Sequence, residues 1–300
     1  MSINPASPAS PTGASHPGGG ESSSPRTWFI TGAGRGFGTE FAASALAAGD
    51  KVAATARNVE ALAGLVAEYG DAILPITLDV TNRDEVFAAV ELAEATFGSV
   101  DVVVNNAGYG LFGAVEELTP AELQSQLEVN LFGPLHVTQA VLPGMRNRGS
   151  GHIIQISTVG GIAAFPILGG YSASKWALEG LTESLAQEVA TFGVKVTLVE
   201  PAGYATDWGG SSAKWATPLS QYEEIKSSLF ATGGGLQNDP AGVGPALLAL
   251  VDRAEDAGQA PLRVFFGTHG MQIAEPLYAS RLQNWKETAD VAALAEGTHT

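Results

Sequence analysis

Short apolar runs alternate with amphipathic segments along most of the chain after Pro25. The apolar runs predict strands at 27–31, 51–56, 72–80, 101–108, 151–157 and 194–201. The segments between them predict helices at 37–49, 59–70, 83–98, 119–145 and 171–192. Strands and helices that alternate in this way predict a doubly wound parallel sheet, Rossmann-like, in a single α/β domain that spans residues 25–300.

The stretch at 207–238 interrupts this rhythm. It consists of loop residues around one predicted short helix. Long insertions in compact domains often serve as lids or binding loops, so this stretch is predicted to be a substrate lid. After it, the pattern predicts a last strand at 261–267 and a last helix at 270–290, within a C-terminal section at 261–300.

Residues 1–24 are mostly Pro, Ser, Gly and Ala, and they are predicted to form a disordered tail because they offer little apolar surface to bury. The tail lacks the basic start and apolar stretch of a secretory signal. No apolar run reaches the roughly 18 residues of a membrane span. We therefore expect a cytoplasmic protein that does not bind membranes.

Composition excludes several kinds of chemistry. The net charge of −16 argues against nucleic-acid binding, which needs clustered Lys and Arg. The chain contains no Cys, which excludes disulfides, thiolate catalysis and Cys-based zinc sites. Its five His residues are scattered without ligand spacing, so no metal site is expected.

A glycine-rich turn follows the first predicted strand and leads into the first helix. Gly32, Gly36 and Gly38 have the spacing GxxxGxG, and Gly34 adds an overlapping GxG. Glycines at such a turn let backbone N–H groups approach a pyrophosphate at the positive end of a helix. A tight strand-to-helix turn without a ligand is the alternative. The position after the first strand of an alternating α/β pattern favours dinucleotide binding.

Five short motifs occur in a fixed order along the chain: TGxxxGxG at 31–38, an Asp after the third strand (Asp79), NNAG at 105–108, Asn130 with Gly133, and YxxxK at Tyr171 and Lys175. With these motifs the chain resembles the short-chain dehydrogenase/reductase family over about residues 25–207. The resemblance implies a nicotinamide cofactor site formed by Thr31, Gly32, Gly34, Arg35, Gly36, Phe37, Gly38, Arg57, Asp79, Val80, Asn106, Ala107, Gly108, Lys175, Pro201, Gly203, Tyr204 and Thr206.

The end of the second strand indicates which cofactor is used. An NAD enzyme usually has an Asp or Glu there, which accepts hydrogen bonds from the ribose 2′-OH. Here the segment 55–58 has no carboxylate, whereas Arg57 and Arg35 carry guanidinium groups suited to a 2′-phosphate. Both could instead be solvated surface groups. The pattern predicts NADP(H) in preference to NAD(H).

Tyr171 and Lys175 are four residues apart and so share one face of a helix. A nearby ammonium and the positive charge of an oxidised nicotinamide both favour the phenolate, so Tyr171 becomes a usable proton donor and acceptor. The resemblance further implies that Lys175 holds the nicotinamide ribose. It also implies that Asn130 supports a water that links Lys175 to solvent.

One hydroxyl is expected to face this pair, and two are available, Ser157 and Thr158. Successive residues of a strand point to opposite faces, so only one of them can do so. The family residue is usually Ser, which favours Ser157, but it usually lies thirteen residues before the Tyr. That spacing favours Thr158 as the catalytic hydroxyl, with Ser157 as the alternative.

The segment after the sixth strand departs from the family pattern PGxxxT. Pro201 and Thr206 match, but Ala202 stands where Gly is usual, and Gly203 is expected to supply the flexibility. The backbone at Tyr204 and the hydroxyl of Thr206 are then expected to contact the carboxamide and phosphates of the cofactor.

Substrate contacts are predicted from 109–112, from 163–168 and from the lid, all rich in apolar or aromatic residues such as Trp208, Trp215 and Tyr222. They suit a moderately large apolar ketone or secondary alcohol, although these aromatics could instead only pack the lid.

The sequence thus predicts an NADP(H)-dependent oxidoreductase for carbonyl/alcohol pairs. A cofactor-binding sensor without turnover and a sugar-nucleotide epimerase or dehydratase are the alternatives. The resemblance implies a homodimer or homotetramer formed through the helices at 119–146 and 171–192.

Overall fold

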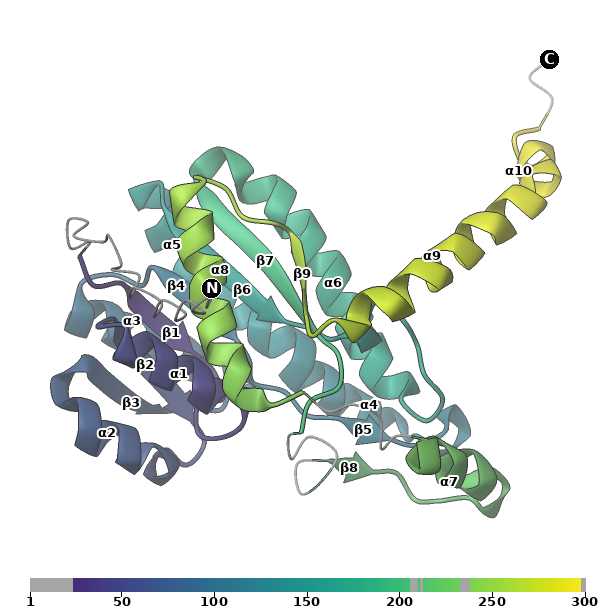
Figure 1. The fold of residues 1–300 in the computed structure, drawn as a ribbon, viewed down its shortest axis with the longest axis horizontal. Coiled ribbons are helices and arrows are strands. Elements are labelled where there is room, and N and C mark those ends of the chain that lie inside the picture. Colours follow the sequence, from purple (N-terminus) through teal and green to yellow (C-terminus); the bar gives the residue numbers. More distant parts are fainter. Residues whose placement is uncertain (1–23, 206–209, 211–212, 233–237, 298–300) are drawn as a thin grey trace, which may run out of the picture.

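The central feature of the fold is a parallel β-sheet. The computed structural model describes residues 24–205, 210, 213–232 and 238–297. Within these residues, seven parallel strands form one sheet in the order β3-β2-β1-β4-β6-β7-β9 (Figure 1). The strands are β1 (Thr27–Ile30), β2 (Lys51–Ala56), β3 (Ile73–Thr77), β4 (Val102–Asn105), β6 (Gly151–Ile156), β7 (Val194–Pro201) and β9 (Arg263–Phe266). The prediction of a doubly wound, Rossmann-like parallel sheet is confirmed.

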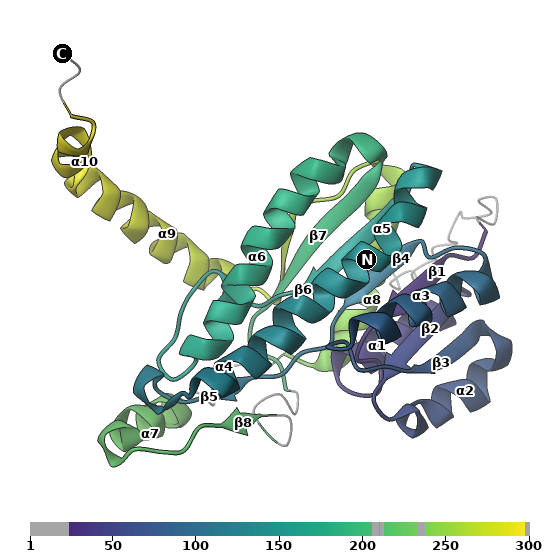
Figure 2. The same cartoon turned by 180° about the vertical axis from the view of Figure 1, so that it is seen from behind.

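Helices cover both faces of the sheet, as Figures 1 and 2 show from opposite sides. One face carries α1 (Phe37–Ala47) and α8 (Val243–Asp256), which pack against each other. The other face carries α3 (Arg83–Phe97), α5 (Gly133–Arg148) and α6 (Gly169–Val189). The short helix α2 (Ala63–Tyr69) lies beside β3. Because the sheet is covered on both sides, each strand contributes apolar residues to two separate cores.

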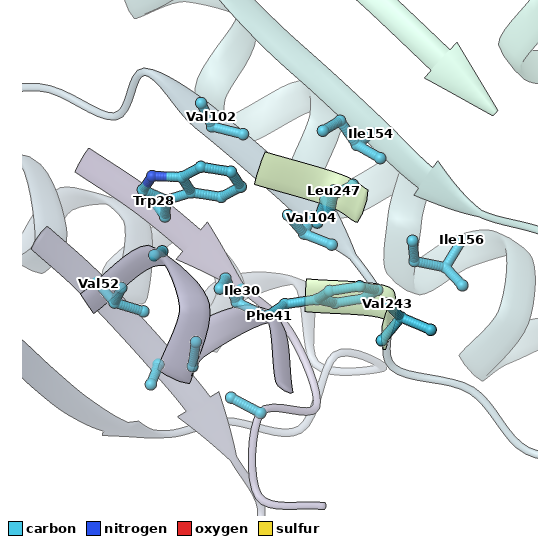
Figure 3. Close-up of a cluster of buried hydrophobic side chains, with 14 of the residues drawn as sticks. Trp28, Ile30, Phe41, Val52, Val102, Val104, Ile154, Ile156, Val243 and Leu247 are labelled. Atoms are coloured by element: carbon cyan, nitrogen blue, oxygen red, sulfur yellow. The ribbon is translucent and has the colours of Figure 1, made fainter. Parts of the chain in front are cut away.

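Strand β1 illustrates how one strand supplies both cores. Trp28 and Ile30 point into the core under α1 and α8, where they pack near Phe41 and Leu247 (Figure 3). Phe29, between them, points into the core under α3 and α5. All of these side chains are at least 99% buried. Burying a side chain of this size contributes about 2–3 kcal/mol to stability, so the alternation along the strand fixes its register in the sheet.

The predicted helix at 119–145 is divided in the structure. The helix α4 (Pro120–Leu127) begins with a capping box between Thr119 and Glu122. It passes through a π-helical segment, Glu128–Phe132, into α5. The wider π turn contains Asn130, whose side chain is fully buried. Such turns place a side chain where a regular helix would not.

The C-terminal part also differs from the prediction. Helix α8 was not predicted, although its apolar residues recur at helical spacing. The last helix is α9 (His269–Glu287), and a separate short helix, α10 (Ala289–Ala295), follows it. Both project away from the sheet (Figure 1). No helix in the described part of the chain is long and apolar enough to cross a membrane.

The predicted lid contains β8 (Lys214–Trp215) and α7 (Glu223–Thr232) within its described residues. Strand β8 pairs in parallel with β5 (Leu111–Phe112), from the loop after β4. The predicted disordered tail at 1–24 lies outside the described residues except for Ser24.

Candidate active site

A large cleft opens at the carboxyl ends of the central strands. Its volume is about 1710 Å³, and its walls come from the loops after β1, β2, β3, β4, β6 and β7 together with α6. The strand order reverses between β1 and β4, and doubly wound sheets bind ligands at such a switch point. Of the predicted site residues, the cleft is bordered by Gly32, Gly34, Arg35, Gly36, Phe37, Arg57, Asp79, Val80, Asn106, Ala107, Gly108, Ser157, Thr158, Tyr171, Lys175, Pro201, Gly203 and Tyr204.

The glycine-rich turn between β1 and α1 has the geometry of an anion cradle. Gly36 has a φ of 56° and no atom stands within 4 Å of the position that a Cβ would take. The first turn of α1 has no side-chain cap, and Gly36 and Phe37 at its start border the cleft. A helix N-terminus of this kind attracts phosphate groups. These features fit the pyrophosphate of a dinucleotide.

Two predicted cofactor residues have structural roles instead of bordering the cleft. The Thr31 Oγ1 accepts hydrogen bonds from the backbone N–H groups of Asn106 and Ala107, both at 3.0 Å. A Cβ at Gly38 would collide with the carbonyl oxygen of Gly32. Thr31 thus joins the loops after β1 and β4, and Gly38 allows α1 to approach the turn closely. Thr206 lies outside the described residues.

Polar groups occupy the end of the cleft near β2 and β3. Arg35 and Arg57 are exposed on its rim, and neither forms an ion pair with another described residue. Asp79 Oδ1 accepts hydrogen bonds from the backbone N–H and the hydroxyl of Thr81, at 3.0 and 2.8 Å. The rim therefore presents two cations that are free to bind an anionic ligand.

Tyr171 and Thr158 meet at the centre of the cleft. Tyr171 lies in the first turn of α6 and is 7% exposed. Burial raises the pKa of its phenol, and a hydrogen bond with the Thr158 side chain acts in the opposite direction. Thr158 Oγ1 also accepts a hydrogen bond from the Gly160 N–H, at 3.2 Å. The threonine hydroxyl is thus held against the tyrosine.

Lys175 is buried one turn further along α6. Its Nζ donates a hydrogen bond of 2.8 Å to the carbonyl oxygen of Ile156, at the end of β6. Burial lowers the pKa of the ammonium to about 8, and the carboxylate of Glu179 opposes this shift. Lys175 borders the same cleft as Tyr171, so the predicted pair shares one site.

The second candidate hydroxyl has different surroundings. Ser157 also borders the cleft, but its hydroxyl lies beside the carboxylate of Glu179. Burial raises the pKa of that acid, and the Ser157 side chain acts in the opposite direction. The hydroxyl and both carboxylate oxygens lack a well-aligned hydrogen bond. Ser157 therefore faces the interior beneath the loop, whereas Thr158 faces Tyr171.

Asn130 does not border the cleft. Its Nδ2 donates hydrogen bonds of 3.1 Å to the Tyr109 carbonyl oxygen and to the Ser174 hydroxyl. Its Oδ1 accepts one of 3.2 Å from the Tyr109 N–H. The side chain thus joins the loop after β4 to α6, which carries Tyr171. A water-supporting role for Asn130 stays a prediction.

The predicted substrate segments divide into two groups. Tyr109, Phe165 and Leu168 border the cleft, as expected. Phe112 and Trp215 instead stack on each other, with ring centroids 4.7 Å apart, so they fasten β8 to β5. Trp208 lies outside the described residues.

Sequence reasoning missed the contact that anchors the lid. The Glu117 carboxylate, whose side chain is fully buried, forms a 2.6 Å ion pair with Lys226 of α7. It also accepts hydrogen bonds from the backbone N–H groups of Leu219 and Ala114, at 2.6 and 2.7 Å. Nothing in the sequence pairs residues 117 and 226, which are far apart in the chain. The Lys214 ammonium, from the same lid, lies 4.7 Å from the centre of the Tyr109 ring at the mouth of the cleft.

A comparison with protein families places the chain in one family. The family model for short chain dehydrogenases matches residues 26–217. The chain belongs to this family. The predicted resemblance is therefore confirmed, and the protein is an NAD(P)-dependent oxidoreductase that acts on CH–OH groups. No group of acidic or His side chains in the described residues could hold a metal ion.

Individual relatives agree with this assignment. Oxidoreductase BOA17 of Botryotinia fuckeliana is 39% identical over 277 residues, which cover 89% of this chain and 99% of that protein. The crystal structure of a short-chain dehydrogenase from Streptomyces avermitilis is 39% identical, with a TM-score of 0.84, and the match covers 92% of this chain and 100% of that one. An alcohol dehydrogenase from the archaeon Thermococcus sibiricus, complexed with 5-hydroxy-NADP, is 28% identical with a TM-score of 0.68 over 81% and 96% of the two chains.

Proposed function

We propose that this dehydrogenase interconverts a ketone or aldehyde and the corresponding alcohol, with NADP(H) as its cofactor and Tyr171 as the acid and base. One observation carries the proposal. Thr158, Tyr171 and Lys175 border the same cleft as the glycine-rich turn, whose open backbone fits a pyrophosphate. Proton-transfer groups and a dinucleotide cradle in one cleft suit hydride transfer to a carbonyl carbon.

Each residue has a defined task in this proposal. Bound NADP(H) supplies the hydride for reduction, or accepts it in oxidation, at the carbon of the substrate. In reduction, Tyr171 donates its phenolic proton to the carbonyl oxygen, and the Thr158 hydroxyl holds that oxygen by a hydrogen bond. In oxidation, the Tyr171 phenolate accepts the proton of the alcohol. Lys175 supports the phenolate by its positive charge.

The raised pKa of Tyr171 fits a proton donor better than a base. Burial keeps the phenol protonated, as the reduction direction requires. Oxidation requires the phenolate. The positive charges of the Lys175 ammonium and the oxidised nicotinamide must then offset the rise that burial causes in the pKa of Tyr171. We therefore infer that reduction of carbonyls extends to lower pH than the reverse reaction.

NADP(H) is proposed over NAD(H) because of the rim of the cleft. Arg35 and Arg57 present two guanidinium groups near the end of β2, and the segment 55–58 contains no carboxylate. A 2′-phosphate can accept hydrogen bonds from both arginines. The Thermococcus sibiricus relative, which was solved with an NADP derivative, supports this choice.

The substrate is proposed to be a moderately large apolar carbonyl compound or secondary alcohol. Tyr109, Phe165 and Leu168 give the cleft an aromatic and aliphatic wall beyond Tyr171. Such walls favour apolar ligands with one reacting polar group. Association into dimers or tetramers and a cytoplasmic location stay predictions from the sequence.

A carbonyl and alcohol panel tests the proposed function. Aliphatic, aryl and polycyclic ketones are incubated with NADPH or NADH, and the matching alcohols with NADP+ or NAD+, while absorbance at the nicotinamide band is followed. We expect turnover of apolar ketones with NADPH and loss of turnover in Tyr171→Phe. Cofactor binding without turnover of any compound, with Tyr171→Phe binding equally well, would instead identify a sensor.

A further inference from the structure

A buried acidic cluster lies directly beneath the loop that carries Thr158. Glu179 of α6 and Glu200 of β7 are 5% and 1% exposed, yet both bear carboxyl groups. Arg263 of β9 joins them: its Nη2 lies 3.2 Å from Glu179 Oε2, and its Nε lies 3.4 Å from Glu200 Oε1. The family roles assigned above do not include these three residues. Buried carboxyl groups are costly, so their position needs an explanation.

The cluster adjoins Lys175 and the loop that carries Ser157 and Thr158. Glu179 follows Lys175 by one helical turn on the same face of α6. Its carboxylate lies beside the hydroxyl of Ser157, which directly precedes Thr158. Glu200 directly precedes Pro201, whose carbonyl oxygen lies 3.4 Å from Thr158 Oγ1. A Cβ at Gly161 would meet both Ser157 Oγ and Glu179 Oε1, so the loop packs tightly on the acid.

The charges that face Glu179 come from three elements. Lys175 and Glu183 belong to α6, Glu200 to β7 and Arg263 to β9. Burial, and then the nearby charge of Glu179, raises the pKa of Glu200 to about 7. Burial also raises the pKa of Glu179, whereas Ser157, Arg263 and Lys175 lower it. Arg263 and Lys175 thus favour the charged form of Glu179 against the effect of burial, and that charge in turn favours the ammonium form of Lys175.

We propose that Glu179 is a positioning residue for catalysis, which keeps Lys175 in its ammonium form and holds Ser157 beneath the loop so that Thr158 faces Tyr171. Arg263 holds Glu179 in its charged form from the opposite side. Glu179 does not border the cleft, so it acts through Lys175 and Ser157. The inference rests on the proposed function, because it assumes that Tyr171 and Lys175 perform the proton transfer.

The pH profile of alcohol oxidation tests this role. Oxidation requires the Tyr171 phenolate, so kcat/KM rises with pH through the apparent pKa of Tyr171. Removing the charge of Glu179 lets Lys175 lose its proton at lower pH, which leaves the phenolate with less support. The acidic limb of this profile is the range in which kcat/KM rises with pH. We expect Glu179→Gln to shift this limb to higher pH by about one unit. Glu179→Asp, which keeps the charge, should restore the limb while kcat stays several-fold reduced.

Glu183→Gln is the matched control. Glu183 lies one turn further along α6 and pairs with the same Arg263 Nη2 at 3.1 Å, but its side chain is 54% exposed. This variant should leave the limb in place. A purely structural role of Glu179 would lower kcat/KM equally at every pH, and an unmoved limb in folded Glu179→Gln would overturn the proposal.

A second variant covers the case in which Glu179→Gln does not fold. Arg263 is 34% exposed in its side chain, so Arg263→Gln should be tolerated. It removes the cation that keeps Glu179 charged, and we expect the acidic limb to move upward as well. An unmoved limb in this variant would equally overturn the inference. If the wild-type enzyme turns over no alcohol or carbonyl in the panel, the proposed function fails first, and the two failures are thereby distinguished.

Discussion

The hydroxyls of Ser157 and Thr158 lie on opposite sides of the loop that follows β6. Thr158 forms a hydrogen bond with Tyr171, whereas Ser157 lies against Glu179. Thr158 is extended, with φ −175° and ψ 162°. Successive residues of an extended chain point in opposite directions. The arrangement supports Thr158 as the catalytic hydroxyl, in agreement with the spacing of thirteen residues before Tyr171.

Two single variants distinguish the hydroxyls. Thr158→Val keeps the shape of the side chain and removes its hydrogen bond, so we expect kcat/KM to fall about 10²–10³-fold. Ser157→Ala should cost less than about tenfold, because its hydroxyl does not face the reacting atoms. Steady-state kinetics on the two purified variants, with one ketone and NADPH, provides the measurement. A larger loss in Ser157→Ala would reverse the assignment.

Tyr171→Phe separates proton transfer from cofactor binding. The variant removes only the phenolic oxygen, so the buried ring keeps its packing. We expect kcat to fall by about 10²–10⁴-fold, the range that a general acid contributes. The dissociation constant for NADPH, followed by the fluorescence of the reduced nicotinamide, should change by less than about threefold. Equal turnover in both proteins would exclude Tyr171 as the acid.

The sheet could be predicted because each strand is marked by a pattern of apolar residues within a few positions of the sequence. Strands such as β1 and β6 are short apolar runs that end in turns, and several of the motifs follow the carboxyl ends of such strands. The preference for Thr158 over Ser157 also rests on local information, since strand alternation and sequence spacing both act over a few residues, and it stays a prediction. Helix α8 was missed although its pattern is regular, because no motif marked it.

Other features depend on contacts between distant residues. The turn at Asn130 is π-helical and its buried amide bonds the loop after β4, and helical periodicity gives no sign of either feature. Glu179, Glu200 and Arg263 come from three elements that only the folded sheet brings together. Thr31 matched a cofactor motif, yet its hydroxyl oxygen accepts a hydrogen bond from the backbone of the loop at 105–108. A motif thus identified the site but not what every member of it contacts.

Cofactor preference should respond to the rim of the cleft. Arg57→Asp replaces a guanidinium near the end of β2 with a carboxylate, which repels a 2′-phosphate and can accept hydrogen bonds from a ribose 2′-OH. We expect the ratio of kcat/KM for NADPH to that for NADH to fall at least about tenfold, equivalent to ~1.4 kcal/mol. Arg253→Asp in α8, which makes the same charge change without bordering the cleft, is the control. A wild-type preference for NADH would contradict the underlying proposal.

The core between β1, α1 and α8 should determine much of the stability. Leu247 of α8 is 1% exposed and packs in the cluster with Trp28 and Phe41. Leu247→Ala removes the Cγ and both Cδ atoms of a buried side chain and leaves a cavity. We therefore expect the free energy of unfolding to fall by about 2–5 kcal/mol. Leu282→Ala in α9, where the leucine is 52% exposed, should change it by less than about 0.5 kcal/mol. Urea denaturation measures both, and equal losses would show that α8 is not part of the cooperative core.

The lid should be released by one substitution at a residue that does not border the cleft. Glu117 holds the lid through the backbone N–H of Leu219 and the ammonium of Lys226, which together lower the pKa of its carboxyl to about 2. Because the pKa is lower in the folded protein, this stabilisation is fully present above the ordinary pKa of 4.5. It is lost as the pH falls through that value towards about 2. The anchor therefore holds across neutral pH.

Glu117→Gln removes the charge at every pH. We expect limited proteolysis at pH 7 to cut the segment at 213–232 several-fold faster than in the wild type, as mass spectrometry of the fragments would show. KM for a bulky ketone should rise as well, because the lid carries Lys214 over Tyr109 at the mouth of the cleft. Glu223, whose side chain is 58% exposed, is the second partner of Lys226. Glu223→Gln should therefore leave both readouts unchanged. Equal cleavage of Glu117→Gln and the wild type would show that the pairing of β5 with β8 holds the lid without Glu117.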